Sequence, residues 1–559
     1  MEGEQSMNNL IKSTMKRVLC FVMALTLFCA IPVSKTEAAG APIAVGIDVS
    51  RWQGPINWSA VAASGVTFAF IKVGSMNSGL DPYFVQNMWG AQAAGIKTGV
   101  YIYSYAKNVE QAAAEAQFVL SAISNFRIMM PVVFDIEDKT QKSLPAAELS
   151  MMANTFCAMV EAEGYYPMVY ANKYWFTTKL PGVMYDKWVA QWAGQCDIPD
   201  AAFWQFTEKG SVPGVGGSVD MNYQFKDLSA SIVDTGWVAR RGAMYYYKDY
   251  KMQRGWTDVA GARYFLGADG RMYVGWLPLE DHMYFLQANG VMAVGFTPIG
   301  TAMYCFDSEG RMLTGMQTID GLQYLFTPEG MMYVGMYYDG SHYMYFDIDG
   351  HMLKGLSVIS GQNYYFDENG YMHTGWVPMN GQMYLFAESG PMCYGWFDDG
   401  VYRYYLSPED GHRVSGWMDI EGARYFFDEN GHMQTGYLEQ NGITYLFGAN
   451  GAMYTGWYQN GAARQYFAAD GTMVKGIASI DGATYYFDEQ GNMQTGWVTI
   501  GASTYLFNVD GTMVTDGWYN DGVNTYYLSA DGSRLENVSI MLDGAIYLFD
   551  QNGVALLIG

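Results

Sequence analysis

Four acidic residues stand at positions where strands are expected to end. Asp48 closes the run Val-Gly-Ile-Asp, Asp135 and Glu137 belong to Val-Phe-Asp-Ile-Glu-Asp, and Asp220 lies in Ser-Val-Asp-Met-Asn. Side chains two apart on a strand point to the same face, so Asp135 and Glu137 should project together while Ile136 faces away. Like charge and partial burial raise the pKa of one member of such a pair. A protonated acid beside an ionised one is the arrangement that cleavage of a glycosidic bond requires.

Aromatic residues are expected to surround these strand ends. Sugar rings have flat apolar faces that stack on aromatic rings, while their hydroxyl edges exchange hydrogen bonds. A set of such rings beside paired acids therefore favours a groove for carbohydrate. The rings in question are Trp52, Tyr101, Tyr103, Tyr105, Tyr170, Trp192 and Trp204.

The distribution of histidine and of charge excludes other chemistries. All six histidines lie from His282 to His432, so the region of the paired acids has no imidazole for a Ser-His-Asp or Cys-His hydrolase, or for a histidine-ligated zinc amidase. We expect no metal and no other cofactor. The 55 acidic against 31 basic residues give a net charge of -24, which repels phosphates and argues against nucleic acid as a partner.

The acids belong to a segment in which short β-rich runs alternate with amphipathic stretches. Such alternation predicts an α/β barrel or a wound sheet, with reactive residues at the carboxyl ends of the strands. Cys157 and Cys196 either pair or stay as free thiols, because sequence alone decides neither. We expect strands at 43–48, 68–73, 99–105, 130–136, 167–170, 187–192 and 203–206, and helices at 109–123 and 145–162.

The N-terminus has the layout of a secretory signal peptide over residues 1–39. Basic residues up to Arg17 precede an apolar run over 18–33, and the small residues Ala38 and Ala39 follow. An uncleaved membrane anchor is the alternative, but the run is shorter than the ~20 apolar residues that span a bilayer. We therefore expect an exported protein that has no contact with the membrane after cleavage.

A repeat of roughly twenty residues runs from about Asp227 to the C-terminus. A copy continues from Gly-Trp or a variant of it to an aromatic trio such as Tyr364-Tyr365-Phe366, a turn such as 367–370, and a methionine such as Met372. We expect a hairpin made of the aromatic strand, the turn at 367–370 and a return strand. One such hairpin cannot bury its own face, so the copies should stack into an all-β solenoid with an aromatic and methionine core. The complete Gly-Trp pairs end at Trp237, Trp256, Trp276, Trp376, Trp396, Trp417, Trp457, Trp497 and Trp518.

The change of pattern divides the exported chain into a barrel over 40–228 and a repeat array over 229–559. From Ser229 onward there are 15 basic and 36 acidic residues, so the array carries 21 of the 24 net negative charges. Turn-forming acids that keep an aromatic array soluble explain this charge. Attraction of a cationic wall component is the alternative.

The ordered motifs of the first region resemble the lysozymes of glycoside hydrolase family 25. The resemblance implies an irregular β/α barrel with β-1,4-N-acetylmuramidase activity, which cuts peptidoglycan between N-acetylmuramic acid and N-acetylglucosamine with retention of configuration. It implies that Glu137 is the general acid and that Asp135, Asp48 and Asp220 complete an acidic cup. Lys72 and Gln205 join the aromatic residues as expected substrate-binding groups. The motifs are Gly46-Ile47-Asp48-Val49-Ser50, Trp52-Gln53-Gly54, Phe70-Ile71-Lys72, Gly99-Val100-Tyr101, Asp135-Ile136-Glu137, Tyr170-Ala171-Asn172, Trp204-Gln205-Phe206 and Val219-Asp220.

The repeats resemble the wall-binding repeats of choline-binding proteins and the related glucan-binding and toxin repeats. In the choline-binding version a second tryptophan stands where this chain has other residues, so each cation cage lacks one ring. We expect a wall polysaccharide or teichoic acid as ligand, held by many weak sites in series. The replacing residues are Arg263, Met283, Met303, Gln323, Asn363, Met383, Arg403, Arg424, Thr444 and Thr484.

Together these patterns predict a secreted, wall-associated muramidase that is anchored by its repeats. A non-catalytic glycan-binding adhesin is one alternative, although it would have no chemical reason to keep the pair Asp135 and Glu137. A hydrolase of chitin or glucan is another.

Overall fold

The computed structural model describes residues 41–559, so the expected signal peptide lies outside the described residues. These residues form two compact units that divide between Leu313 and Thr314. The first unit contains a barrel and the first hairpins of the repeat array, and the second contains the remaining hairpins.

The first unit opens with a closed barrel of eight strands, so of the barrel and the wound sheet that the strand pattern left open, the barrel is confirmed, and β9 adds a strand to the seven expected. The chain order of pairing is β1-β2-β4-β5-β6-β7-β8-β9, and β9 pairs back with β1 to close the sheet. All the pairings are parallel except those of β9, which runs antiparallel to β8 and β1. The strands are β1 (Ala44–Val49), β2 (Phe68–Ser75), β4 (Lys97–Tyr103), β5 (Val132–Asp135), β6 (Pro167–Asn172), β7 (Asp186–Ala190), β8 (Ala201–Gly210) and β9 (Val219–Gln224), with β3 (Gly79–Leu80) beside β2.

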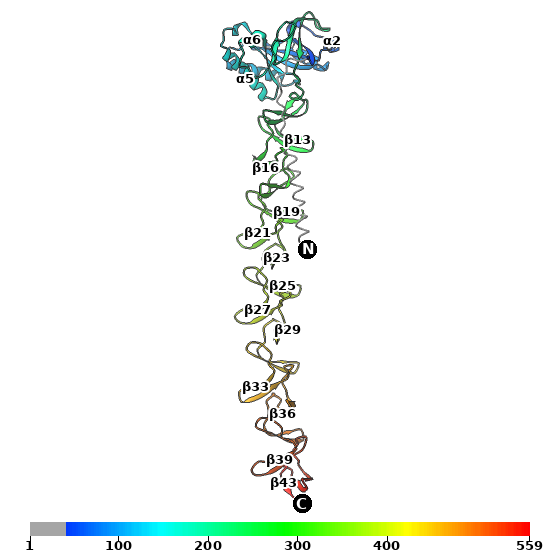
Figure 1. The fold of residues 1–559 in the computed structure, drawn as a ribbon, viewed down its shortest axis with the longest axis vertical. Coiled ribbons are helices and arrows are strands. Elements are labelled where there is room, and N and C mark those ends of the chain that lie inside the picture. The colour runs from blue at the N-terminus through cyan, green and yellow to red at the C-terminus, as the bar shows by residue number, and fades with distance from the viewer. Residues whose placement is uncertain (1–40) are drawn as a thin grey trace. The chain divides into compact units, whose positions relative to one another are not determined.

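The barrel is irregular because, within its described residues, only five α-helices accompany the eight strands. Figure 1 shows α5 and α6 in the barrel region. Helix α4 has the bounds that the sequence predicts, and the Asn108 side chain caps it by accepting from the Gln111 N–H at 2.9 Å. The helices are α2 (Trp58–Ala63), α3 (Phe84–Ala93), α4 (Val109–Ile123), α5 (Ala146–Ala162) and α6 (Lys173–Thr178), with short 3-10 turns η1 (Arg51–Gln53) and η2 (Lys139–Gln141).

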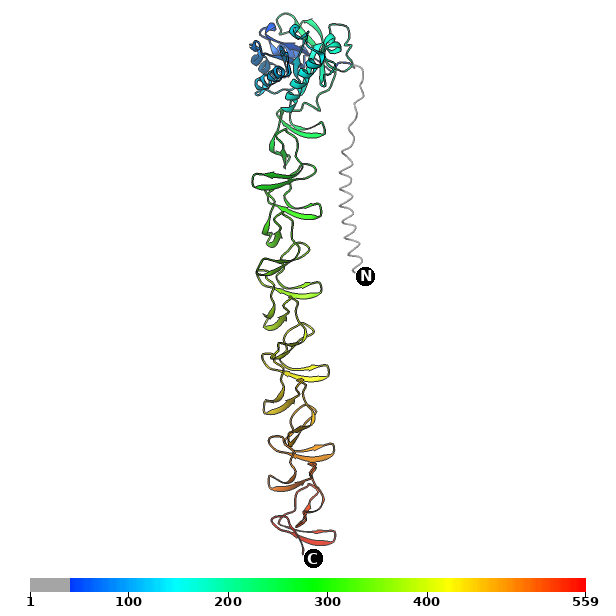
Figure 2. The same ribbon diagram turned by 90° about the vertical axis from the view of Figure 1, so that its left-hand side faces the viewer.

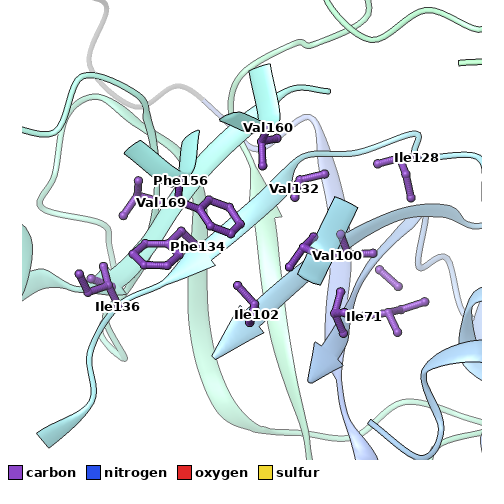
Figure 3. Close-up of a cluster of buried hydrophobic side chains, with 14 of the residues drawn as sticks. Ile71, Val100, Ile102, Ile128, Val132, Phe134, Ile136, Phe156, Val160 and Val169 are labelled. Carbon is purple, nitrogen blue, oxygen red and sulfur yellow. The ribbon is translucent and has the colours of Figure 1, made fainter. Parts of the chain in front are cut away.

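Two hydrophobic cores occupy the two faces of the barrel sheet. On the outer face, Phe134 of β5 stacks on Phe156 of α5 with ring centroids 4.6 Å apart, and Ile136 joins the same cluster (Figure 3). On the inner face, Phe70 stacks on Trp188 at 4.4 Å. Since alternate residues of β5 face these two cores, the strand period directs Asp135 inward while Phe134 and Ile136 point outward.

The repeats form antiparallel hairpins that follow one another along each unit (Figures 1 and 2). The hairpins pair β10 (Gly236–Arg240) with β11 (Ala243–Lys248), β13 (Gly255–Val259) with β14 (Ala262–Leu266), β15 (Gly275–Leu279) with β16 (His282–Leu286), β17 (Gly295–Ile299) with β18 (Ala302–Phe306), β19 (Gly315–Ile319) with β20 (Leu322–Phe326), β21 (Gly335–Tyr338) with β22 (Tyr343–Phe346), β23 (Gly355–Ile359) with β24 (Gln362–Phe366), β25 (Gly375–Met379) with β26 (Gln382–Phe386), β27 (Gly395–Asp398) with β28 (Arg403–Leu406), β29 (Gly416–Ile420) with β30 (Ala423–Phe427), β31 (Gly436–Gln440) with β32 (Ile443–Phe447), β33 (Gly456–Asn460) with β34 (Ala463–Phe467), β35 (Gly476–Ile480) with β36 (Ala483–Phe487), β37 (Gly496–Ile500) with β38 (Ser503–Phe507), β39 (Gly517–Asn520) with β40 (Thr525–Leu528), and β41 (Val538–Leu542) with β42 (Ala545–Phe549). The short strands β12 (Lys251–Met252) and β43 (Ala555–Leu557) extend the first and the last hairpin.

The hairpin turn lies one strand earlier than the sequence analysis expects. In the hairpin of β23 and β24 it is Ser360-Gly361, whose φ angles of 51° and 81° are those of the tight turn that matches strand twist. The turn expected to close the hairpin, at 367–370, instead brings Met372 back to a single bridge with Phe366. No return strand forms there, because the next hairpin begins only three residues after Met372.

Consecutive repeats interlock through their methionines. The Met453 N–H donates to the Arg424 carbonyl of an earlier hairpin at 2.7 Å. Its side chain packs beneath Gly471 of the following turn, where an added Cβ would lie 2.2 Å from the sulfur. The aromatic strand ends in a fully buried ring such as Phe467, so the expected aromatic and methionine core forms between neighbouring copies.

The barrel and the first hairpins pack together inside the first unit. The Tyr247 hydroxyl of β11 donates to the Gly164 carbonyl at 2.7 Å, and Arg241 pairs with Glu161 of α5 at 2.8 Å. These contacts explain why the boundary between the two compact units lies within the repeat array and not at residue 228.

The cysteines of the described chain are free thiols. Cys157 is buried on α5, and Cys196 is half-buried in the loop after β7. The disulfide that the sequence left open between them is therefore not formed. Packing, and not cross-linking, stabilises the barrel.

Candidate active site

A cavity of about 190 Å³ lies inside the barrel at the carboxyl ends of its parallel strands. It is smaller than the ~300–1,000 Å³ typical of ligand pockets, so it fits the reacting portion of a longer chain. A larger groove of about 680 Å³ lies against α5, but it has no titratable side chain in its lining and offers no comparable chemistry. The smaller cavity is lined by Asp48, Ser50, Trp52, Gln53, Lys72, Tyr101, Tyr103, Asp135, Glu137, Tyr170, Trp188, Gln205 and Asp220.

Asp135 and Glu137 project into this cavity together. Asp135 is the last residue of β5 and is 5% exposed, whereas Glu137 follows the strand and is half-buried at the rim. Among the described residues Asp135 Oδ1 has no hydrogen-bond partner, although it is buried. Glu137 Oε2 accepts from the Asn172 amide at 3.4 Å. A buried acceptor without a partner is costly unless a ligand supplies the donor.

Asp48 and Asp220 form a second pair on neighbouring antiparallel strands. They are direct partners in the register of β1 and β9. Asp48 Oδ2 accepts from the amides of Gln205 and Asn222, both at 2.9 Å. The Trp188 indole N–H donates to Asn222 Oδ1 at 2.8 Å and fixes which end of that amide faces Asp48. These donors favour the charged form of Asp48 over that of Asp220.

Burial raises the pKa of all four acids. Burial, and then the charge of Glu137, hold the pKa of Asp135 well above its usual range. Burial also raises the pKa of Glu137, and the Asn172 hydrogen bond opposes it. Burial and then the charge of Asp48 raise the pKa of Asp220 to about 8. Burial also raises the pKa of Asp48, and the hydrogen bonds from Asn222 and Gln205 oppose this shift. The cavity therefore retains protons near neutral pH.

Lys72 is the cation of the cavity lining. Its Nζ lies 5.0 Å from the ring centroid of Tyr103 and 5.8 Å from that of Tyr101. Burial lowers the pKa of Lys72, and the charge of Asp135 opposes this shift. The Tyr103 hydroxyl donates to Asp138 at 3.1 Å, which fixes the ring under the ammonium group. Lys72 thus offsets part of the acidic charge beside Asp135.

The structure separates the expected aromatic residues into two groups. Trp52, Tyr101, Tyr103 and Tyr170 line the cavity, as do the expected Lys72 and Gln205. Three expected rings do not line it, for reasons of strand geometry. Tyr105 lies beyond the end of β4 against Tyr103, Trp192 lies beyond the end of β7 and is 59% exposed, and Trp204 is buried with its indole N–H on the Gln191 carbonyl.

The sequence analysis missed Trp188 in the lining and Asn222 behind it, and it quoted Ser50, Gln53 and Asn172 in motifs without assigning them to the site. The alternation of side chains along β7 could have placed Trp188, because alternate residues of a barrel strand face the interior, where Phe70 also lies. Asn172 is two residues after Tyr170, and Asn222 is two residues after Asp220, so each lies on the same strand face as an expected site residue. The same period of two could have assigned both.

Metal-ligand geometry occurs once among the described residues, away from the barrel. The side chains of Asp347, Asp349 and His351 offer ligand atoms within 4.8 Å of one another. Asp347 Oδ1 is already used by the turn, since it accepts from the Asp349 and His351 N–H groups at 2.9 and 2.8 Å. This group closes a repeat turn and plays no part in the barrel cavity.

A closed β/α barrel with four inward carboxyl groups fits a glycoside hydrolase. The model of glycosyl hydrolases family 25 matches residues 47–215, and the chain belongs to this family. The choline-binding repeat model matches residues 353–378, 414–456, 454–495 and 494–538. Both resemblances read from the sequence are thereby confirmed.

The proteins similar to this chain each cover part of it. YegX of Escherichia coli K12, an uncharacterized protein, is 34% identical over 188 residues, which are 32% of this chain and 68% of YegX. Lysozyme M1 of Streptomyces globisporus is 32% identical over 195 residues, which are 32% of this chain and 66% of that enzyme. Choline binding protein F of Streptococcus pneumoniae is a solved structure with a TM-score of 0.31 and 22% identity, covering 47% of this chain and 99% of that one.

Proposed function

We propose that this chain is an exported N-acetylmuramidase that hydrolyses the bond between N-acetylmuramic acid and N-acetylglucosamine in peptidoglycan. The observation that carries the proposal is the inward pair of Asp135 and Glu137 in an acidic cavity at the barrel mouth. The similarity to Lysozyme M1 supports the substrate. Among the described residues no helix is long and apolar enough to cross a membrane.

Glu137 is the general acid in this proposal. Its carboxyl group stands at the rim, where the oxygen of the leaving sugar arrives, and its raised pKa keeps a proton available. After the bond breaks, the ionised Glu137 takes a proton from the incoming water. The Asn172 amide holds Oε2 in place through both steps.

Asp135 stabilises the positive charge that develops at the anomeric carbon. In the free cavity its burial makes it the more favourable holder of the proton of the pair. An acetamido N–H of the substrate would supply the partner that Asp135 Oδ1 lacks, favour its ionised form and leave the proton with Glu137. Two routes to retention of the anomeric configuration follow from this placement. One is a covalent aspartyl intermediate, and the other is assistance by the oriented acetamido oxygen.

Asp48 and Asp220 hold the substrate and set the charge of the cavity. Asp220 carries a proton near neutral pH and donates toward sugar hydroxyl groups or toward Asp48. The exposed ring of Trp52 at the rim offers a flat face for the next sugar of the chain, since 76% of it is open to solvent. In this proposal the cavity binds one sugar, and the rest of the glycan lies along the rim.

The repeat array holds the enzyme on its substrate. Each copy presents half-buried aromatic rings. Many copies in series keep the enzyme bound to the wall by avidity, even when each copy binds weakly. Wall polysaccharide or teichoic acid is the proposed ligand of the array. The enzyme is accordingly proposed to act as a wall-associated protein.

Incubation with purified peptidoglycan tests the proposal. We expect new reducing ends on N-acetylmuramic acid, and we expect Glu137→Gln to lower the rate by about 10²–10⁴-fold, the usual contribution of a general acid. Glu110→Gln, which changes an exposed glutamate in the first turn of α4 outside the cavity lining, is the matched control and should retain the rate. Binding without any new reducing ends would instead support the adhesin, and faster cleavage of chitin would support a different polysaccharide.

A further inference from the structure

The tryptophans of the Gly-Trp pairs form three-ring sites between consecutive hairpins. Trp457 meets Tyr466 of its own hairpin edge to face, with centroids 5.0 Å apart, and Tyr485 of the next hairpin at 4.9 Å. Contacts of this kind leave one face of the indole available to a cation.

The chain supplies its own cation to six of the nine sites. A quaternary ammonium ion from solution needs the same ring face, so these six sites are already occupied. The pairs are Arg263 on Trp256, Arg413 on Trp376, Arg403 on Trp396, Arg424 on Trp417, Arg464 on Trp457 and Arg534 on Trp497.

Four of these six guanidinium groups also have an oxygen partner. Their carbon atoms lie 4.9 to 5.9 Å from the ring centroids. The partners are Asp258 for Arg263 at 3.6 Å, Asp419 for Arg424 at 2.9 Å, Glu536 for Arg534 at 2.6 Å, and the Glu429 carbonyl for Arg413 at 3.2 Å.

Arg403 and Arg464 have no ion pair within the described chain, and they lie closest to their rings. The distances to the centroids are 4.4 Å for Arg403 and 4.1 Å for Arg464. The residue opposite Arg464 is Gln459, whose amide donates to the carbonyls of its own turn. The residue opposite Arg403 is Asp398, whose carboxylate accepts from a backbone N–H at 2.8 Å. Asp398 is therefore a charged neighbour of Arg403 but not its hydrogen-bond partner. The Thr472 hydrogen bonds lower the pKa of Asp510, and the charge of Arg464 adds to this shift. The N–H edges of both guanidinium groups are left for a group from outside the chain.

We propose that Arg403 on Trp396 and Arg464 on Trp457 bind anionic oxygen groups of a wall glycopolymer, an inference that rests on the proposed wall anchoring. Stacking uses the face of a guanidinium and leaves its N–H edge free, and that edge matches a phosphate or a carboxylate. The indole beside it offers an apolar surface to the neighbouring sugar. Salt screens the acids of the array that lie more than ~8 Å away, so only near neighbours such as Asp398, opposite Arg403, oppose this binding. The anionic group belongs either to the phosphodiesters of teichoic acid or to the lactyl carboxylates of glycan strands that lack stem peptides.

Binding of the full chain to three soluble polymers tests the proposal. The probes are poly(glycerol phosphate), glycan strands that carry lactyl carboxylates, and neutral dextran, with reducing ends followed in parallel so that cleavage is scored separately from binding. The test variant is Arg403→Gln with Arg464→Gln. The matched control is Arg263→Gln with Arg424→Gln, which removes two stacked arginines that already have aspartate partners.

We expect the test variant to lose about 10-fold or more in affinity for one of the two anionic polymers, and that polymer identifies the source of the anion. The control variant should stay within about twofold, and choline should not displace the wild-type chain. Circular dichroism and the Tm of both variants establish that the hairpins remain folded. Equal losses in test and control variants, an unchanged test variant, or a parallel loss on dextran would overturn the proposal, whatever the hydrolysis assay shows.

Discussion

Asp220→Asn should stabilise the barrel at alkaline pH and have little effect at acid pH. The pKa of Asp220 is raised from 3.8 to about 8, chiefly by burial and then by the charge of Asp48. An acid with a raised pKa contributes stability that is fully present below pH ~4 and is lost as the pH rises toward 8. The asparagine stays neutral throughout, so it does not suffer this loss.

The size of the effect follows from the shift. Four pKa units at 1.36 kcal/mol each give an upper bound of about 5–6 kcal/mol. Asp220 is half-buried, so solvent screening reduces this to about 2–3 kcal/mol. In a domain of this size each kcal/mol moves Tm by ~2–4 °C, which predicts a gain of roughly 5–10 °C at pH 8.

Differential scanning calorimetry of the full chain from pH 4 to pH 9 at constant ionic strength measures the difference. The Tm of the variant minus that of the wild type should be near zero at pH 4 and should grow steadily to pH 8. Asp200→Asn, at a surface ion pair with Lys187, is the control and should show no such growth. A difference that is constant with pH, or that shrinks as the pH rises, would refute the assignment of a buried proton to Asp220.

Three other changes test separate contacts. Lys72→Met removes the cation that opposes the raised pKa of Asp135, so the acidic limb of the kcat/KM profile should move to higher pH. Tyr247→Phe removes the 2.7 Å hydrogen bond to the Gly164 carbonyl and should cost about 1–2 kcal/mol in thermal unfolding of the first unit. Gly471→Ala places a Cβ 2.2 Å from a methionine sulfur at a φ of 84° and should cost about 1–3 kcal/mol in chemical denaturation, with the array still folded at low denaturant.

Local patterns gave the sequence analysis its correct results. The amphipathic stretch over 109–123 predicts bounds that match α4, because this signal lies within the helix itself. The period of two on β5 predicts that Asp135 and Glu137 share a face. Each of these conclusions needs only the residues of one element.

The sequence analysis was wrong where a conclusion depended on the exact residue at which a strand ends. The expected strand over 187–192 ends at Ala190, so Trp192 leaves the sheet and its ring points into solvent, while Trp188 faces the cavity. The hairpin turn was misplaced because glycine follows a turn-forming residue in both turns, and in some repeats both turns contain the same pair, as in Asn441-Gly442 and Asn450-Gly451. Only the backbone shows which pair of residues has positive φ at both positions.

The sequence by itself determined the acids, their shared strand faces, the repeat period and the absence of imidazole from the barrel region. Tertiary structure decided which of these groups meet. Barrel closure pairs β1 with β9 and so brings Asp48 to Asp220, and it buries Asp135 without a hydrogen-bond partner. The packing of hairpins likewise decides which rings meet, since Trp457 contacts Tyr485 of the next hairpin. Burial and charge pairing depend on residues far apart in the chain, so the pKa of a side chain is a property of the folded molecule and not of its local sequence.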